Sequence, residues 1–147
     1  MGTPEEKKGL EFKPYSGKIE RGKIREMVQA IGDPHPVYTD AEFARQEGLK
    51  DITIPPTFME SFDMWEGVSF DDLVDFLEMD ARKVLHLEQE YEYFAPIYPE
   101  DVISAQTVVG DVKTKRNGMA LYTLDTTYHN QENQLVMKCK MVLVQVP

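Results

Sequence analysis

The sequence predicts an α+β fold in which an antiparallel sheet wraps a buried helix. Apolar residues recur with the 3.6-residue period of amphipathic helices from residue 20 to about residue 77. After Asp80 the period changes to the two-residue alternation of strands, and Asn117-Gly118 is a strong hairpin signal. Helices that come first and an antiparallel meander that follows are the arrangement of an α+β domain.

Composition bounds the class of protein. The 147 residues suit one domain over residues 1–147, with about residues 1–14 expected to be a flexible, polar N-terminal segment. The net charge of −10 argues against nucleic acid or an anionic membrane surface as the main partner. The apolar runs are too short to span a bilayer, and the start lacks the apolar core of a signal peptide. A cytoplasmic protein is therefore the simplest interpretation.

The first predicted helix covers residues 20–31. Its apolar stripe follows the spacing i, i+3, i+4 and i+7 and consists of Ile24, Met27, Val28 and Ile31. Gly32 is expected to stop this helix. Thr39 is followed three residues later by Glu42, a capping-box pattern that predicts a short helix over residues 41–47.

A more apolar helix is predicted over residues 57–66, after two adjacent prolines. Large apolar residues recur in it at i, i+4 and i+7, namely Phe58, Phe62 and Trp65. We expect the sheet to bury all three, because the helix has bulky residues on most of its circumference. Ser69 and Asp72 form the Ser-x-x-Asp pattern that predicts one further short helix.

Four strands are predicted, over residues 86–94, 102–112, 119–130 and 134–146. Lysines and apolar residues alternate in the last of them, which places Lys138 and Lys140 on one face and Met137, Cys139 and Met141 on the other. Cys139 is then expected to be an inert core residue. One cysteine and three scattered histidines give no spacing typical of a metal site.

The loop over residues 32–40, GDPHPVYTD, holds the candidate chemistry of the chain. Two prolines restrict its backbone and so fix the directions of its side chains. In one interpretation Asp33 is a turn former that bonds its own backbone, and His35 is a partly exposed loop residue. In the other they are a general acid/base pair, because histidine titrates near neutral pH. Spacing alone leaves both open.

Other clusters have simpler structural interpretations. The aromatic residues Tyr91, Tyr93, Phe94 and Tyr98 are expected to pack on strand faces and turns and not to form a base-stacking platform. The acidic run Asp71, Asp72, Asp75, Glu78 and Asp80 is expected to be a solvated helix face and not a metal site. His86 and His129 are expected to be structural.

Three stretches resemble a known family. They are GKIREMVQAIGDPHPVYTD, ITIPPTF and EQEYEYFAPIYPEDVISA, which occur in family order from about residue 19 to residue 104. They resemble the MaoC-like hydratase/dehydratase group of the hot-dog superfamily, in particular its FAS1-like N-terminal dehydratase subgroup. The resemblance implies a single hot-dog domain, with a central helix wrapped by a curved antiparallel sheet. It also implies a dimer that acts on acyl thioesters of CoA or of acyl carrier protein, with no further cofactor.

The resemblance also implies roles for particular residues. In active members a loop of the form Gly-Asp-x-Asn-Pro-hydrophobic-His holds the water that adds to the double bond of an R-specific enoyl thioester. Here Gly32, Asp33, Pro36 and Val37 match that loop, whereas His35 stands in the place of the Asn and Tyr38 in the place of the catalytic His. Backbone N–H groups at the start of the central helix polarise the thioester carbonyl, which assigns Pro56, Thr57 and Phe58 to substrate binding. Glu100 replaces a usual Gly.

These departures give three possible functions. The first is a subunit of an enoyl-CoA hydratase or 3-hydroxyacyl-thioester dehydratase that shapes the acyl site beside a catalytic hot-dog partner. The second is a self-sufficient homodimeric hydratase in which Asp33 works with His35 or Tyr38. The third is a non-enzymatic module that binds acyl thioesters. We expect a homodimer or heterodimer with a second hot-dog subunit, because a lone hot-dog domain would leave a sheet edge unpaired.

Overall fold

The computed structural model describes residues 2–147, and its elements confirm the α+β prediction. The helices are α1 (Arg21–Ile31), α2 (Ala41–Gln46), α3 (Phe58–Glu66) and α4 (Phe70–Phe76), and the strands are β1 (Tyr15–Lys18), β2 (Val84–Tyr93), β3 (Val102–Thr114), β4 (Ala120–His129) and β5 (Leu135–Gln145). Among the residues 2–147, no helix is both long enough and apolar enough to cross a bilayer.

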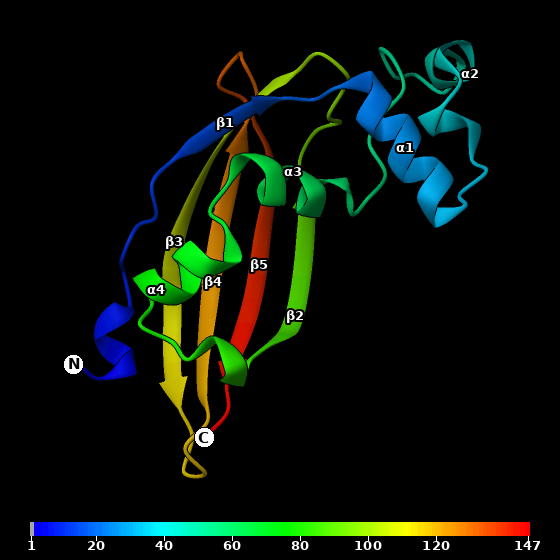
Figure 1. Cartoon of the computed structure of the whole chain (residues 1–147). Helices are drawn as coiled ribbons and strands as arrows, with labels where there is room; N and C mark the ends of the chain where they lie inside the picture. Colours follow the sequence, from blue (N-terminus) through cyan, green and yellow to red (C-terminus); the bar gives the residue numbers. More distant parts are fainter. Residues whose placement is uncertain (1) are drawn as a thin grey trace.

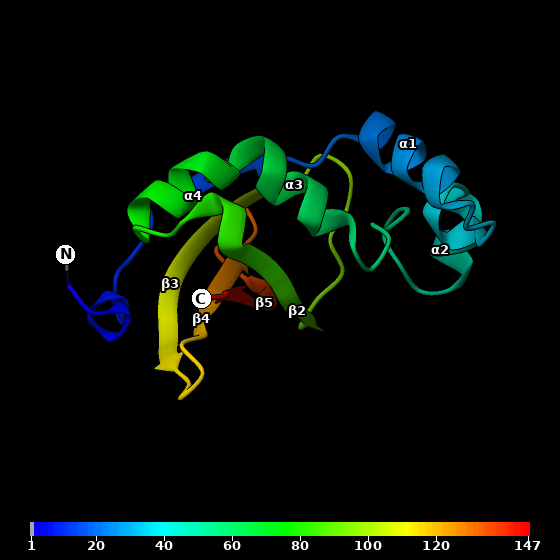
Figure 2. The ribbon, with the colours of Figure 1, turned by 60° about the horizontal axis from the view of Figure 1, so that its bottom comes forward.

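The five strands form one antiparallel sheet in the order β1-β3-β4-β5-β2. Helices α3 and α4 cross the face of the sheet that is turned toward the viewer in Figure 1. The sheet curves beneath these two helices (Figure 2), so that they occupy its concave face. Helices α1 and α2 form a lobe that projects past the β2 side of the sheet, which we call the α1–α2 lobe.

The hairpin predicted at Asn117-Gly118 is confirmed. It joins β3 to β4, with Thr114 opposite Ala120 in the register. Gly118 has φ +86°, a left-handed conformation that favours glycine, and its N–H donates to the Lys115 carbonyl at 2.9 Å.

Helix α3 buries two of the three residues predicted to face the sheet. Phe58 and Phe62 are 3% and 5% exposed, but Trp65 is 74% exposed, so the prediction for Trp65 is wrong. The fully buried residue of this helix is Met59, and Asp63, one helical turn further on, hydrogen-bonds to tyrosines of β1 and β4. Met59 and Asp63 lie at i and i+4 and therefore share a face. The helix turns that face toward the sheet, which leaves Trp65 on the flank near α1.

Gly67 separates α3 from α4. A Cβ atom at this position would lie 2.5 Å from the Asp63 carbonyl oxygen and 3.0 Å from the Tyr15 ring, so a side chain does not fit. The chain therefore turns here in close contact with its own backbone, and the central helix is divided into two segments.

One of the two predicted helix caps is displaced by a residue. Asp40, and not Thr39, caps α2, and its carboxylate accepts from the N–H groups of Glu42 and Phe43 at 3.0 and 3.2 Å. Aspartate is as good a cap as threonine, and here it directly precedes the first helical residue. Ser69 caps α4 as predicted and accepts from the Asp72 N–H at 3.1 Å.

The N-terminal residues add a strand that the sequence does not reveal. β1 has only four residues, too few for the alternating pattern to be distinctive, yet it pairs with β3 from Tyr15 opposite Ala105 to Lys18 opposite Val102. Residues 9–12, within the segment expected to be flexible, also bond to β3, and the Phe12 N–H donates to the Thr107 carbonyl at 2.9 Å. The Phe12 side chain is buried against Phe76 of α4, with ring centroids 4.5 Å apart.

Candidate functional site

The candidate loop begins where α1 ends. Gly32 has φ +69°, and its N–H bonds back to the Gln29 carbonyl at 3.3 Å, which ends the helix as predicted. The next N–H, of Asp33, donates to the Val28 carbonyl at 3.2 Å. The sharp exit carries the loop away from the α1 axis, and a single 3₁₀ turn, Pro36–Tyr38, follows.

Asp33 and His35 both bond the backbone of the loop. The Asp33 Oδ1 accepts from the His35 N–H at 2.9 Å, and the His35 Nδ1 accepts from the Val37 N–H at 3.2 Å. The Asp33 bond therefore reaches the main chain of His35 and not its ring. Because Nδ1 accepts, a neutral His35 carries its proton on Nε2. This geometry is the one expected of a turn-forming aspartate.

Tyr38 lies beside these two residues. Its ring centroid is 6.0 Å from that of His35 and the two rings are tilted by 58°, while the Phe43 ring meets that of His35 edge-on, with the centroids 5.8 Å apart. Burial, together with the negative charge of Asp33, raises the pKa of the Tyr38 phenol above its usual value of 10.0. The phenol therefore stays neutral at physiological pH, where it can donate a hydrogen bond but is a poor base.

Hydrogen bonds connect this loop and the edge strand β2 to the segment that leads into α3. The Thr53 N–H donates to the Val37 carbonyl at 3.3 Å, and the Thr53 hydroxyl donates to the Ile97 carbonyl at 3.1 Å. Pro56, three residues after Thr53, accepts at its carbonyl from the hydroxyl of Tyr93 on the edge strand β2. Pro56 and Thr57 are exposed and Phe58 is buried, so the backbone at the start of α3 is accessible beside the loop. The structure brings the two predicted parts of the site into one hydrogen-bonded region.

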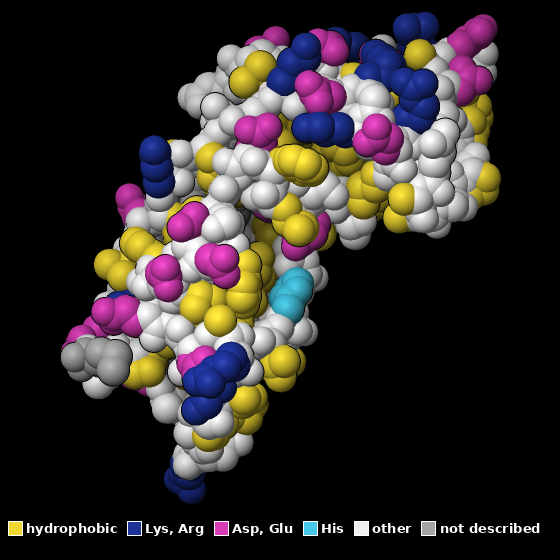
Figure 3. Space-filling view, in the orientation of Figure 1, with side chains coloured by type: hydrophobic (Ala, Val, Ile, Leu, Met, Phe, Trp, Pro, Cys, Tyr) yellow, Lys and Arg dark blue, Asp and Glu magenta, His cyan; other side chains and the backbone are white. Residues whose placement is uncertain are grey.

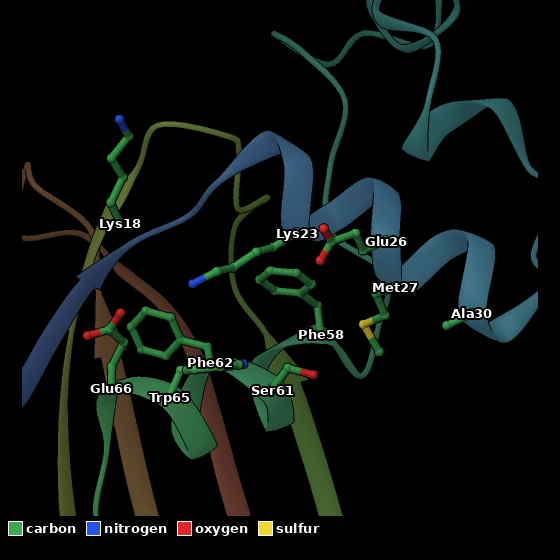
Figure 4. A pocket seen from close by; sticks show the side chains of 10 residues that line it. All are labelled: Lys18, Lys23, Glu26, Met27, Ala30, Phe58, Ser61, Phe62, Trp65 and Glu66. Atoms are coloured by element: carbon green, nitrogen blue, oxygen red, sulfur yellow. The ribbon is translucent and has the colours of Figure 1, made fainter.

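A groove runs between α1 and α3. It has a volume of about 290 Å³, and Figure 4 shows side chains of the two helices facing each other across it. Met27 and Ala30 of α1 and Phe58, Phe62 and Trp65 of α3 supply its apolar lining. At one end the Lys23 ammonium lies 5.2 Å from the centroid of the Trp65 ring. The groove starts at the same end of α3 as Thr57 and Phe58, so it can hold an apolar chain that extends from that point.

The sequence analysis missed a polar network under α3. The two carboxylate oxygens of Asp63 accept from the Tyr15 hydroxyl at 2.7 Å and from the Tyr128 hydroxyl at 2.6 Å. Burial raises the pKa of Asp63 to about 6, although the two tyrosine hydrogen bonds act in the opposite direction. Burial and the Asp63 charge raise the pKa values of both tyrosines.

Further polar pairs lie on both sides of Asp63. The hydroxyls of Thr107 and Thr126 lie 2.7 Å apart, and Asp63, Thr107 and Thr126 line a cavity of about 60 Å³ beneath the break between α3 and α4. On the other side the Tyr91 hydroxyl donates to Glu60 at 3.2 Å. The available sequence signal was the pair Glu60 and Asp63, two of the three acidic residues of a helix that otherwise has mostly large apolar side chains.

The remaining candidate residues have structural roles. Cys139 is 5% exposed, and burial raises the pKa of its thiol to about 12, so it is the inert core residue that the sequence predicts. Tyr91 packs against the main core, and Asp80 caps the short turn before β2 by accepting from the Arg82 N–H at 3.1 Å. The ring of His86 contacts the Glu88 carbonyl at 3.1 Å.

The comparisons with known proteins identify the family. A family model described as "FAS1-like, dehydratase domain region" matches residues 6–139. The chain belongs to this family. It is similar to a UPF0336 protein of Thermobifida fusca, with 32% identity over 131 residues, which is 89% of this chain and 84% of that protein. It is also 29% identical over 129 residues to a probable enoyl-CoA hydratase alpha subunit of Thermomonospora curvata, over 77% of this chain and 40% of that protein.

A solved structure agrees with the fold. The C-terminally truncated HadBC (3R-hydroxyacyl-ACP dehydratase) complex of Mycobacterium tuberculosis superposes with a TM-score of 0.78 at 20% identity, over 94% of this chain and 96% of the compared chain. The hot-dog fold that the sequence analysis inferred from resemblance is confirmed.

Proposed function

We propose that this chain is a subunit of an R-specific enoyl-thioester hydratase, or of the 3-hydroxyacyl-thioester dehydratase that runs the same reaction in reverse. It shapes the acyl-thioester site, and a second hot-dog chain supplies the intact Asp/His pair. The state of the loop carries this proposal. Tyr38 is a neutral phenol, and Asp33 and His35 hydrogen-bond the backbone of their own loop.

The reaction needs two proton transfers. In hydration the water oxygen bonds to the β carbon as the carbon–carbon π bond breaks, water gives one proton to a base, and the α carbon receives one from an acid. Each of these groups is typically worth about 10²–10⁴-fold in rate. A loop without a working base cannot perform both transfers at neutral pH, so the reacting water belongs beside the partner's loop.

The contribution of this chain is to bind and orient the substrate. The backbone N–H of Thr57, the residue that caps α3, is placed to polarise the thioester carbonyl, because it lies at the start of the helix and no backbone group among residues 2–147 accepts from it. Pro56 has no N–H group and the Phe58 N–H donates to the Pro55 carbonyl, so these two residues shape the site on either side of Thr57. The groove between α1 and α3 receives the acyl chain. We place this reaction in the cytoplasm, with an acyl-CoA or acyl-carrier-protein thioester as substrate and no further cofactor.

The test compares the isolated chain with its complex. The purified chain should hydrate crotonyl-CoA slowly or not at all, and a hot-dog protein that co-purifies with it should restore turnover. In the complex, His35→Ala should change kcat by no more than a few-fold, as should the control His129→Ala at a histidine outside the loop. Tyr38→Phe should behave in the same way.

The alternatives predict different results. Rapid turnover by the isolated chain, lost on changing Asp33 and either His35 or Tyr38, would instead establish a self-sufficient homodimeric enzyme. A chain that binds the thioester but is inactive with every hot-dog partner would establish a non-enzymatic binding module. The double change His35→Asn and Tyr38→His restores the family pattern and should raise the activity of the isolated chain.

A further inference from the structure

The edge strand β2 carries a row of three glutamates. Glu88, Glu90 and Glu92 alternate with Gln89 and Tyr91, which point toward α3, so the glutamates lie together on the convex face of the sheet. All three are exposed. The sequence of β2, VLHLEQEYEY, contains no lysine or arginine. β2 is the last strand in the sheet order, so one side of this row faces the open edge.

The inner side of the row is partly neutralised. On the neighbouring strand β5, Lys140 lies opposite Glu90 and Lys138 lies opposite Glu92. The Lys140 ammonium is 3.6 Å from the Glu90 carboxylate, and the Lys138 ammonium lies 5.5 Å from the Phe94 ring. Glu88 lies opposite Val142 and has no lysine beside it in the register. Among residues 2–147, the ion pair of this row is therefore the one between Glu90 and Lys140, which lies within the sheet.

The edge has the features of a pairing surface. β2 is ten residues long, and exposed apolar side chains lie at its two ends, namely Leu85, Leu87, Tyr93 and Phe94. The molecule is hollowed beside β2, below the α1–α2 lobe (Figure 3). A long edge strand with exposed apolar residues is a template for pairing with another chain.

We infer that β2 pairs with the edge strand of a different hot-dog chain, one whose strand presents lysine or arginine to the glutamate row, in preference to a second copy of this chain. The inference rests on the proposed function, which requires a second hot-dog subunit, and it specifies the chemistry of that subunit's edge.

Sheet geometry disfavours self-pairing. In an antiparallel pair, residues directly opposite each other point to the same face, so two copies that continue the sheet would place both glutamate rows on that face. In registers centred on the middle of the glutamate row, the glutamates of one copy would lie directly opposite those of the other. Like charges directly opposite each other are destabilising, whereas opposite charges are stabilising. Each copy also has a net charge of −10. A partner strand with basic side chains would instead place positive charge opposite the glutamates, so that the rows through Glu90 and Glu92, across β5, β2 and the partner strand, would alternate between positive and negative charge.

The experiment uses this chain as its own probe. The variant Glu88→Lys/Glu90→Lys/Glu92→Lys supplies the basic edge, and sedimentation equilibrium measures its association with the wild-type chain. At low salt the mixture should associate at least about tenfold more tightly than either protein alone, and this preference should shrink at high salt. Hydrogen exchange of the β2 amides should slow in the mixture, which identifies this edge as the contact.

A matched control separates local charge from total charge. The variant Asp71→Lys/Asp75→Lys/Glu132→Lys makes the same change in net charge at exposed positions outside β2, and it should show no such preference or protection of β2. The neutral variant Glu88→Gln/Glu90→Gln/Glu92→Gln should associate with itself more tightly than the wild type does. Circular dichroism establishes that each variant is folded.

Two results would overturn the inference. If the wild type and the basic variant do not pair preferentially, the glutamates close the edge against every partner. If the wild type alone forms a tight, salt-independent dimer through β2, the row does not select a basic edge. Neither result tests the hydratase proposal, which depends on the turnover of crotonyl-CoA by the complex.

Discussion

Glu100 is the residue whose backbone departs most clearly from what its side chain favours. It has φ +73°, a left-handed conformation in which a Cβ atom is crowded. Its carboxylate lies 2.7 Å from the Lys18 ammonium, but both side chains are more than half exposed. An exposed ion pair contributes little to stability, so it does not offset the strained backbone.

We predict that Glu100→Gly stabilises the protein. Removing the left-handed strain should raise the free energy of unfolding by about 0.5–1 kcal/mol, after the loss of the Lys18 pair and the added flexibility of glycine are deducted. Urea denaturation measures the change. Glu132→Gly, at an exposed turn residue without a positive φ, is the control and should be neutral or destabilising. A destabilised Glu100→Gly protein would show that the ion pair outweighs the strain.

At the scale of single residues, the sequence predicted which residues form the candidate loop better than it predicted which atoms they bond. It identified Asp33, His35 and Tyr38 as the candidate loop residues, but it left open whether Asp33 would bond its own backbone or a histidine ring. The answer depends on the rotation of one side chain within a two-residue turn, which neither periodicity nor composition reports. The Asp63 network was missed because its tyrosines are distant in the sequence, at positions 15 and 128.

Among the elements, α3 shows that a large apolar side chain is not necessarily a buried one. Two of its three large aromatic residues, Phe62 and Trp65, are three residues apart, yet one is 5% and the other 74% exposed. The difference follows from the orientation of the helix, which turns Met59 and Asp63 toward the sheet.

Alanine substitutions should reveal this orientation. We expect Phe62→Ala to lower the free energy of unfolding by about 3–5 kcal/mol, because it opens a cavity in the core. Trp65→Ala should lower it by about 1 kcal/mol or less, since it removes little more than the contact with Lys23. Denaturant unfolding of both variants gives the comparison. Similar losses for the two would contradict the orientation of α3.

The sequence predicted most elements because their periods are distinct. Helices α1 to α4 and strands β2 to β5 were all expected near their observed positions, and the Asn117-Gly118 turn fixed one hairpin. β1 was not expected, because a four-residue strand depends on pairing with a distant neighbour and has little local signal. The rotation of α3 was not expected either, because it turns Met59 and Asp63 toward the sheet, where Tyr15 and Tyr128 donate to Asp63, and these partners are distant in the sequence.

In the whole molecule, the Asp63 network links stability to pH. It joins β1, α3 and β4, so the protonation state of one carboxyl affects the contact between the helix and the sheet. The folded protein raises the pKa of Asp63 from 3.8 to about 6 through burial. Between these values the folded state binds more protons than the unfolded state. The contribution of Asp63 is therefore fully present below about pH 4 and is lost as the pH rises through about 6.

We predict that the stability of Asp63→Asn relative to the wild type is greater at neutral pH than at acidic pH. The difference in free energy of unfolding between Asp63→Asn and the wild type should grow by about 2–3 kcal/mol between pH 4 and pH 7, in favour of the variant. The difference between the two curves cancels the other carboxylates, and exposed Asp75→Asn is the control. A flat difference would mean that Asp63 titrates equally in the folded and unfolded states.

The hydroxyl of Tyr93 has a consequence for cooperativity. Tyr93 belongs to the edge strand and donates to the Pro56 carbonyl, which shares a peptide group with the Thr57 N–H that is proposed to hold the thioester. A partner that orders the edge would therefore also order the substrate site. By thermodynamic reciprocity, the factor by which the partner tightens substrate binding equals the factor by which substrate tightens the complex. Subunits joined in this way would assemble most firmly when the acyl thioester is abundant, and Tyr93→Phe should weaken that coupling more than either affinity alone.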